Sequence, residues 1–179
     1  MSDLSKLKDF VEILQAVISS TAIVVAGWWA YRRYYVQAES HPHIATSCQI
    51  KFIGLQRGQW MIELIATLEN KGKVEHRFKD FTFDLNGIRK CDSLVQSIQW
   101  GGQINFPIAL AEGSLLPSDF QFFSLGPGVT GNYSFVTSVP DDIKFLILHC
   151  RFRYMDRLSY SHSMECTQIV PQPPVATPP

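Results

Sequence analysis

The chain has little charge, no paired cysteine motif and no known catalytic signature. Charged residues make up 18% of its 179 residues, against a typical share of ~25%, and 16 Lys and Arg balance 16 Asp and Glu. With no excess of positive charge, a nucleic-acid partner is not expected. The sequence lacks GxSxG, HExxH, GxxxxGK[ST] and GxGxxG motifs, and it offers no set of acid, base and nucleophile. We therefore expect a protein that is not an enzyme and that uses no cofactor.

The cysteines are few and lack the spacing of a disulfide scaffold. Their number is even, yet no CxxC pair occurs among Cys48, Cys91, Cys150 and Cys166. This arrangement favours free thiols in a folded core over disulfides.

Only one long apolar run occurs, and it lies near the N-terminus. The stretch VEILQAVISSTAIVVAGWWAY, residues 11–31, contains a single charge, Glu12, and no proline. As a helix it is about 31 Å long, which matches the hydrocarbon thickness of a bilayer. We predict a transmembrane helix over residues 11–35, after an interfacial segment over residues 1–10 in which the helix begins near Ser2 or Ser5. The alternatives are a buried helix of a soluble domain and a cleaved signal peptide. The length of the run disfavours the first, and the acidic segment before it disfavours the second.

The end of this run has the composition of a membrane interface. Aromatic rings favour headgroup depth and arginines meet lipid phosphate, so the bilayer contact is assigned to Trp28, Trp29, Tyr31, Arg32, Arg33, Tyr34 and Tyr35. The two arginines outweigh the mixed charges before the span. The positive-inside rule therefore predicts a single-pass protein with a cytosolic C-terminal domain.

Small residues form two stripes along the predicted span. Ala16, Ser20 and Gly27 lie near one stripe, and Ala22, Ala26 and Ala30 form another. Small residues let helices approach closely in lipid, where a polar side chain such as Gln15 also favours association. We predict a homo-oligomer formed through the span. The alternative is that these residues merely fill a solitary span.

After a linker over residues 36–42, apolar residues recur at every second position, which indicates β-strands. HIATSCQIKFIG, WMIELIATL and HRFKDFTFDLNG alternate in this way, and the last changes phase near Lys79 and Asp80, which predicts a bulge. QINFPIAL, residues 103–110, is a candidate edge strand because it contains Pro107. FQFFSL and VTGNYSFVTSV are predicted to pair across the GPG turn between them.

The final strands are predicted to form a hairpin, KFLILHCRFRY with SYSHSMECTQIV. One face of the first carries Leu146, Leu148, Cys150, Phe152 and Tyr154, and the matching inward face of the second carries Tyr160, His162, Met164 and Cys166. Cys150 and His162 can then lie close together, which suggests a thiol nucleophile. A packed thiol beside a hydrogen-bonded histidine is the favoured interpretation.

Seven or eight strands without helical periodicity predict an all-β, two-sheet sandwich. The TLENKG strand end, the FSLGPGVTGNYSF turn and the closing hairpin FLILHCRFRY/SYSHSMECTQI resemble an immunoglobulin-like module over residues 43–170. An antibody-type bridge is excluded, because the strand around Leu64 has no cysteine to pair with Cys150. The proline-rich residues 171–179 are expected to form a disordered tail.

On the opposite face of the same hairpin strand, His149, Arg151 and Arg153 form a basic row. Such a row suits a phosphate-bearing ligand, an acidic protein partner or lipid headgroups, and the alternative is a solvated strand face. His41 and His43 have no third ligand nearby, so no metal is expected. The remaining acidic side chains are attributed to turns, namely Asp80, Asp84, Asp92, Asp141 and Asp142.

The layout, a short N-terminal span followed by a compact β domain, is similar to small membrane effectors of bacterial antiviral signalling systems. That resemblance implies a sensor whose soluble domain binds a ligand or partner and whose spans assemble in the membrane. The alternative is an extracytoplasmic immunoglobulin-like domain that acts in envelope assembly or adhesion.

Overall fold

The computed structural model describes residues 2–36, 41–97, 101–155 and 160–171, without the side chains of residues 2–7, 35 and 36. The chain divides into two compact units, residues 1–41 and residues 42–179. We call the first the helical unit and the second the sheet domain. Most of the predicted linker and nearly all of the predicted tail lie outside the described residues.

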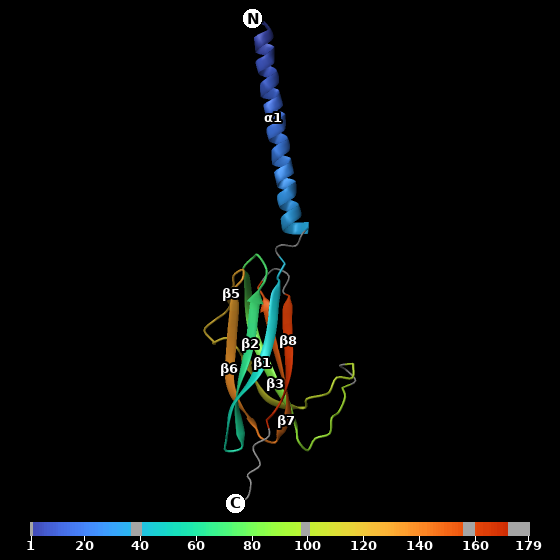
Figure 1. The fold of residues 1–179 in the computed structure, drawn as a ribbon, viewed down its shortest axis with the longest axis vertical. Helices are drawn as coiled ribbons and strands as arrows, with labels where there is room; N and C mark the ends of the chain where they lie inside the picture. The colour runs from blue at the N-terminus through green and yellow to red at the C-terminus, as the bar shows by residue number, and fades with distance from the viewer. Residues whose placement is uncertain (1, 37–40, 98–100, 156–159, 172–179) are drawn as a thin grey trace, which may run out of the picture. The chain divides into compact units, whose positions relative to one another are not determined.

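The helical unit is one long helix, α1, Ser2–Tyr31, which continues as a π-helical turn, η1, Arg32–Val36. Figure 1 shows α1 as a single helix without a break near residue 10. The segment Lys8–Tyr34 is long and apolar enough to cross a membrane, and none of it is buried inside the protein. The predicted N-terminal apolar helix is confirmed, and its start agrees with the predicted Ser2.

The sheet domain contains eight described strands in two antiparallel sheets (Figure 1). The three-stranded sheet has the order β1-β2-β6, from β1 (Ile44–Gln56), β2 (Gln59–Asn70) and β6 (Thr130–Pro140). The five-stranded sheet has the order β4-β3-β7-β8, and β5 also pairs with β3. Its strands are β3 (His76–Arg89), β4 (Ile108–Ser114), β5 (Phe123–Leu125), β7 (Ile143–Tyr154) and β8 (Ser161–Ile169).

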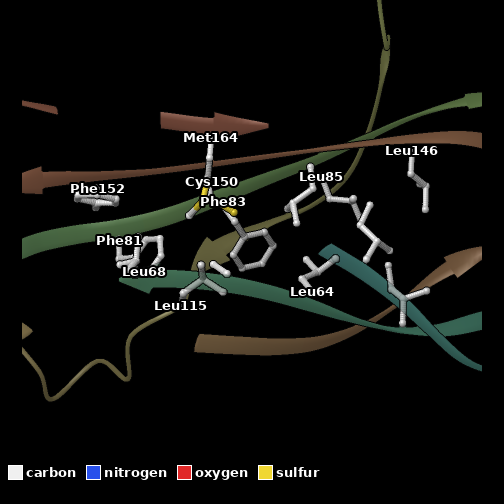
Figure 2. Packing of buried hydrophobic residues seen from close by; sticks show 14 of the residues in the cluster. Leu64, Leu68, Phe81, Phe83, Leu85, Leu115, Leu146, Cys150, Phe152 and Met164 are labelled. Atoms are coloured by element: carbon white, nitrogen blue, oxygen red, sulfur yellow. The ribbon is translucent and has the colours of Figure 1, made fainter. Parts of the chain in front are cut away.

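One hydrophobic core lies between the two sheets. The inward positions of β2, among them Leu64 and Leu68, meet Phe81, Phe83 and Leu85 of β3 (Figure 2). Alternate residues of each strand supply this core because successive side chains point to opposite faces. The predicted period of two in β2 is confirmed by its alternating burial.

The predicted bulge in β3 is confirmed. The pairing of β3 with β7 shifts register between Lys79 and Thr82, and Asp80 has a left-handed backbone with φ of 53°. The extra residue allows Phe78 and Phe81, which are three positions apart, both to be fully buried.

The predicted pairing across the GPG turn is wrong. β5 pairs with β3 and β6 pairs with β2, so the turn carries the chain from one sheet to the other. The buried Asn70 at the end of β2 holds this crossing. Its side-chain amide donates to the carbonyls of Val74 and Leu125, and its backbone carbonyl accepts from Gly128.

The candidate strand over residues 103–110 is partly wrong. β4 begins at Ile108, directly after Pro107, and runs on to Ser114. Proline lacks an amide hydrogen, so the ladder starts beyond it. The edge position itself is confirmed, because β4 is an outer strand of the five-stranded sheet.

The closing hairpin has the predicted parity from His162 to Cys166, but Tyr160, which was predicted to face inward, is 50% exposed. Phe152 lies opposite His162, Cys150 opposite Met164 and Leu148 opposite Cys166. Cys150, Phe152 and Tyr154 are buried, so the basic row must point outward from β7.

Candidate functional site

The basic row lies on the outer face of β7, where the sequence places it. Arg151 and Arg153 are exposed and His149 is half-buried. The three residues alternate with the buried Cys150 and Phe152, which fix the direction of the strand face.

Two members of the row are paired with carboxylates of β3. Nε of Arg153 donates to Oδ2 of Asp80 at 2.7 Å, and Nδ1 of His149 lies 3.7 Å from Oδ2 of Asp84. The assignment of these two aspartates to turns is wrong, because Asp84 lies within β3 and Asp80 lies in its bulge. Arg151 has no carboxylate partner among the described residues.

Acidic residues also surround His149 along the sheet. The pairing registers place Glu112 of β4 opposite Asp84, Asp84 opposite His149, and His149 opposite Glu165 of β8. The outer face therefore has mixed charge, and among the described residues Arg151 of β7 and Lys79 of β3 are cations without a carboxylate partner. This pattern disfavours broad attraction to an anionic lipid surface and favours a local site.

A cleft of about 490 Å³ lies on this face, and we call it the loop cleft. Its floor includes Ile147, His149 and Arg151 of β7. On the side of β8 it is lined by Ser161, Ser163 and Glu165. The opposite wall is formed by the connection between β3 and β4, through Ser97, Gln103, Ile104, Asn105 and Phe106.

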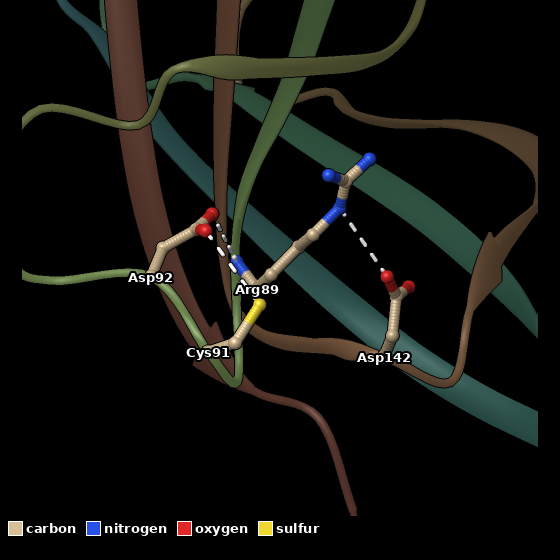
Figure 3. A network of polar contacts seen from close by, with 4 residues as sticks. All are labelled: Arg89, Cys91, Asp92 and Asp142. Carbon is tan, nitrogen blue, oxygen red and sulfur yellow. Dashed lines mark hydrogen bonds and ion pairs between the residues drawn. The ribbon is translucent and has the colours of Figure 1, made fainter.

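The described parts of this connection, residues 90–97 and 101–107, are braced at the base and pair with each other. The backbone amide of Arg89 donates to Asp92, and Nε of Arg89 lies 3.3 Å from Oδ2 of Asp142 in the turn between β6 and β7 (Figure 3). Further along, Gln96 and Ile104 form an isolated bridge. These bonds hold a wall of polar and apolar side chains beside the sheet.

Chemically, the loop cleft combines the guanidinium of Arg151, the imidazole of His149 and the carboxylate of Glu165 with several neutral hydrogen-bonding groups. A guanidinium can hold two oxygens of a phosphate or carboxylate, and serine hydroxyls and side-chain amides can donate to the remaining oxygens. Ile104, Phe106 and Ile147 add an apolar wall on which a flat group could pack. The arrangement suits a small ligand that carries an anionic group.

Cys150 and His162 do not form a catalytic pair. His162 lies opposite Phe152, stacks on its ring, and has Nδ1 3.4 Å from the hydroxyl of Tyr154. Burial raises the pKa of the Cys150 thiol to about 12. A thiol with so high a pKa stays protonated at neutral pH and is a poor nucleophile.

The residues assigned to the membrane interface lie at the C-terminal end of α1 and in η1. Trp28, Trp29, Tyr31 and Tyr34 are all more than half exposed. The guanidinium of Arg33 lies 5.1 Å from the centre of the Trp29 ring. Arg32 is exposed, and the side chain of Tyr35 lies outside the described part of the structure.

The two stripes of small residues differ on the helix surface. Ala22 and Ala26 line a shallow apolar groove together with Val17, Ile18, Thr21, Val25 and Trp29. Ala16, Ser20 and Gly27 are not part of this groove, and neither is Gln15. The Ser20 hydroxyl donates to the backbone carbonyl of Ala16 at 2.8 Å, so its polar group is satisfied within the helix.

No group of three His, Cys, Asp or Glu side chains with metal-site geometry occurs among the described residues. The row of Glu112, Asp84, His149 and Glu165 is therefore spread across four strands rather than gathered at one point. Neither this row nor the wall of the loop cleft was found from the sequence. Strand pairing was the missing information, because these residues come from four strands and a long connection.

Comparison with known proteins gives no family for this chain. No family model matches it, and no curated protein matches it. Ten chains of solved structures match. One is a structural-genomics target with 11% identity and a TM-score of 0.46, covering 72% of this chain and 87% of that chain. Another is a putative ApaA protein from Bordetella pertussis with 11% identity and a TM-score of 0.47, covering 75% of this chain and 97% of that chain.

Proposed function

We propose that this chain is a single-pass, membrane-anchored interaction or sensor protein without enzymatic activity. The observation that carries this proposal is the exposure of α1. Its apolar side chains, such as Ile23 at 72% and Val24 at 70%, find no cover inside the protein. A bilayer would cover these side chains, and the thickness of its hydrocarbon core matches the length of the segment.

In this proposal the sheet domain is an immunoglobulin-like module on the cytosolic side of the membrane. Arg32 and Arg33 support that orientation through the positive-inside rule. The reverse orientation, with the domain in envelope assembly or adhesion, remains the competing function. Labelling of the exposed Cys91 by a membrane-impermeant maleimide separates the two. In a cytosolic domain, Cys91 reacts only after the cells are opened.

The domain would bind its partner or ligand at the loop cleft, with Arg151 as the central contact. A phosphate-bearing small molecule matches the chemistry of the cleft most closely, and an acidic protein segment is the second candidate. Arg153 is already engaged by Asp80, and His149 faces Asp84, so both contribute less to an added anion.

Replacing Arg151 by glutamate is expected to weaken the binding of a phosphate probe strongly. A charge-assisted hydrogen bond contributes roughly 1.5 to 3 kcal/mol, so the affinity for adenosine monophosphate should fall about tenfold or more. Titration of the full-length protein in detergent, followed by NMR or calorimetry, measures this. Arg153→Glu is the matched control, with the same charge change on the same strand and an expected loss of less than about threefold. If both variants lose affinity for the probe equally, the loss reflects the change in net charge, and Arg151 is not a specific contact.

The span is proposed to self-associate through one of its small-residue stripes. Ala16→Leu with Gly27→Leu enlarges one stripe, and Ala22→Leu with Ala26→Leu enlarges the other. A Cβ at Gly27 meets no atom of the chain within 4 Å, so leucine there should disturb only contacts between copies. We expect one double variant to lower membrane crosslinking several-fold while the other stays near wild type. Unchanged crosslinking in both would remove the self-association proposal.

We extend the proposal to a membrane-acting effector of bacterial antiviral defence, because the chain has a short N-terminal span followed by a compact β domain. In that role, ligand binding by the sheet domain would promote assembly of the spans. The shared layout is the support for this assignment.

A further inference from the structure

Three of the four cysteines lie together inside the sheet domain. Cys48 is on β1, the outer strand of the three-stranded sheet, and Cys166 is on β8, the outer strand of the five-stranded sheet. Both side chains are half-buried and pack on the common core beside the buried Cys150. Strands β1 and β8 approach each other within Cα–Cα distances of 8 Å. A disulfide requires Cα atoms within about 7 Å, so only closely facing positions of two such neighbouring strands can be bridged.

The thiols of Cys48 and Cys166 contact each other directly. The Cys166 thiol donates a hydrogen bond to the Cys48 sulfur, which lowers the pKa of Cys48 and raises that of Cys166. Burial adds to the rise at Cys166, and Cys150 is held protonated by its own burial. Cys48 is therefore the thiol that ionises first, with Cys166 positioned next to it.

We propose that Cys48 and Cys166 are a redox modification site, at which a small disulfide oxidant such as oxidised glutathione joins β1 to β8 through a reversible disulfide. The Cys48 thiolate attacks one sulfur of the oxidant and releases one glutathione thiolate, which takes up the Cys48 proton. Once Cys48 is in the mixed disulfide, its thiolate no longer raises the pKa of Cys166. Cys166 then attacks the Cys48 sulfur and releases the second glutathione thiolate, which takes up the Cys166 proton. Two protein thiols and one oxidised glutathione thus become one protein disulfide and two reduced glutathiones.

This bridge would close one side of the stack formed by the two sheets. No backbone ladder joins the two sheets in the described residues, and the bridge would tie their neighbouring edges covalently. It would also enclose the chain from residue 48 to residue 166, a long loop whose closure restricts the unfolded state strongly. In a reducing cytosol the pair stays as thiols, whereas in an oxidising compartment the bridge persists.

The test uses the full-length protein in detergent micelles, incubated with oxidised glutathione. Free thiols are then alkylated, the protein is digested without reduction, and linked peptides are identified by mass spectrometry. We expect a peptide pair joined through Cys48 and Cys166 in monomeric protein, reversal by dithiothreitol, and a rise in Tm of about 10 °C.

Variants separate this bridge from other thiol chemistry. Cys91→Ser removes the exposed thiol and should leave both the linked peptide and the rise in Tm unchanged. Cys48→Ala should lose both, and its Tm under reducing conditions verifies that the variant folds. Cys166→Ala provides the same comparison from the other strand. Linkage through Cys150, or glutathione attached at Cys91 with Cys48 and Cys166 still free to alkylate, would overturn the proposal.

Discussion

Introducing arginine at Ile18 and Val24 is expected to move the protein from the membrane fraction to the supernatant. These positions flank the centre of the segment Lys8–Tyr34, and both are well exposed on α1. The eight Val, Ile and Leu residues of the run contribute on the order of −4 kcal/mol to insertion, whereas each central arginine costs roughly 3 kcal/mol. The two substitutions together therefore exceed the entire gain. Fractionation of cells that express the double variant, with immunoblotting of both fractions, measures the shift.

A matched control places the same added charge elsewhere. Gln49→Arg with Gln56→Arg adds two arginines at exposed positions of β1 and should leave the protein in the membrane fraction. If the Ile18→Arg, Val24→Arg variant also stays in the membrane fraction, α1 is not the anchor.

Replacing Asn70 by alanine is expected to destabilise the sheet domain by about 3 kcal/mol, because several buried polar groups lose their partners. The side chain of Asn70 is fully buried and donates to the carbonyls of Val74 and Leu125 at 2.9 and 2.8 Å. Its Oδ1 accepts from the backbone amide of Gly72 at 2.9 Å. Thermal unfolding of the protein in detergent should show a Tm lower by about 10 °C.

Asn132→Ala is the corresponding control. Asn132 accepts a hydrogen bond from the Thr67 hydroxyl at 2.8 Å, but this pair is exposed on the surface. Its loss should cost less than about 0.5 kcal/mol, since water replaces the missing partner. Equal changes in Tm for the two variants would show that Asn70 does not hold the crossing between the sheets.

Features that depend on local periodicity were predictable from the sequence. The exposed helix follows from one long apolar run with a single charge, and β2 and the closing hairpin follow from alternating apolar residues. The bulge at Asp80 was predicted because Phe78 and Phe81 differ in phase, and only an extra residue lets both face the core.

The partner of each strand was harder to predict. FQFFSL and VTGNYSFVTSV flank a GPG turn, which suggests a hairpin, yet they belong to different sheets. The deciding contacts come from Asn70, more than fifty positions before Leu125, and no local pattern reports such a contact.

The charge balance of the outer face could not be predicted either, because it depends on which strands pair. The sequence places His149, Arg151 and Arg153 on one side of β7, but Asp80 and Asp84 reach them only through the pairing of β3 with β7. Arg151 stands out as the member of the basic row without a carboxylate partner only after the described ion pairs are known. The loop cleft likewise depends on a connection that carries no periodic signal.

Membrane extraction of the full-length wild-type protein tests the central claim most directly. After cell lysis without detergent and washing of the membranes at alkaline pH, the protein is expected to remain in the pellet and to dissolve only when detergent is added. Recovery of the intact chain in the detergent-free supernatant as a monomer would contradict the membrane anchor.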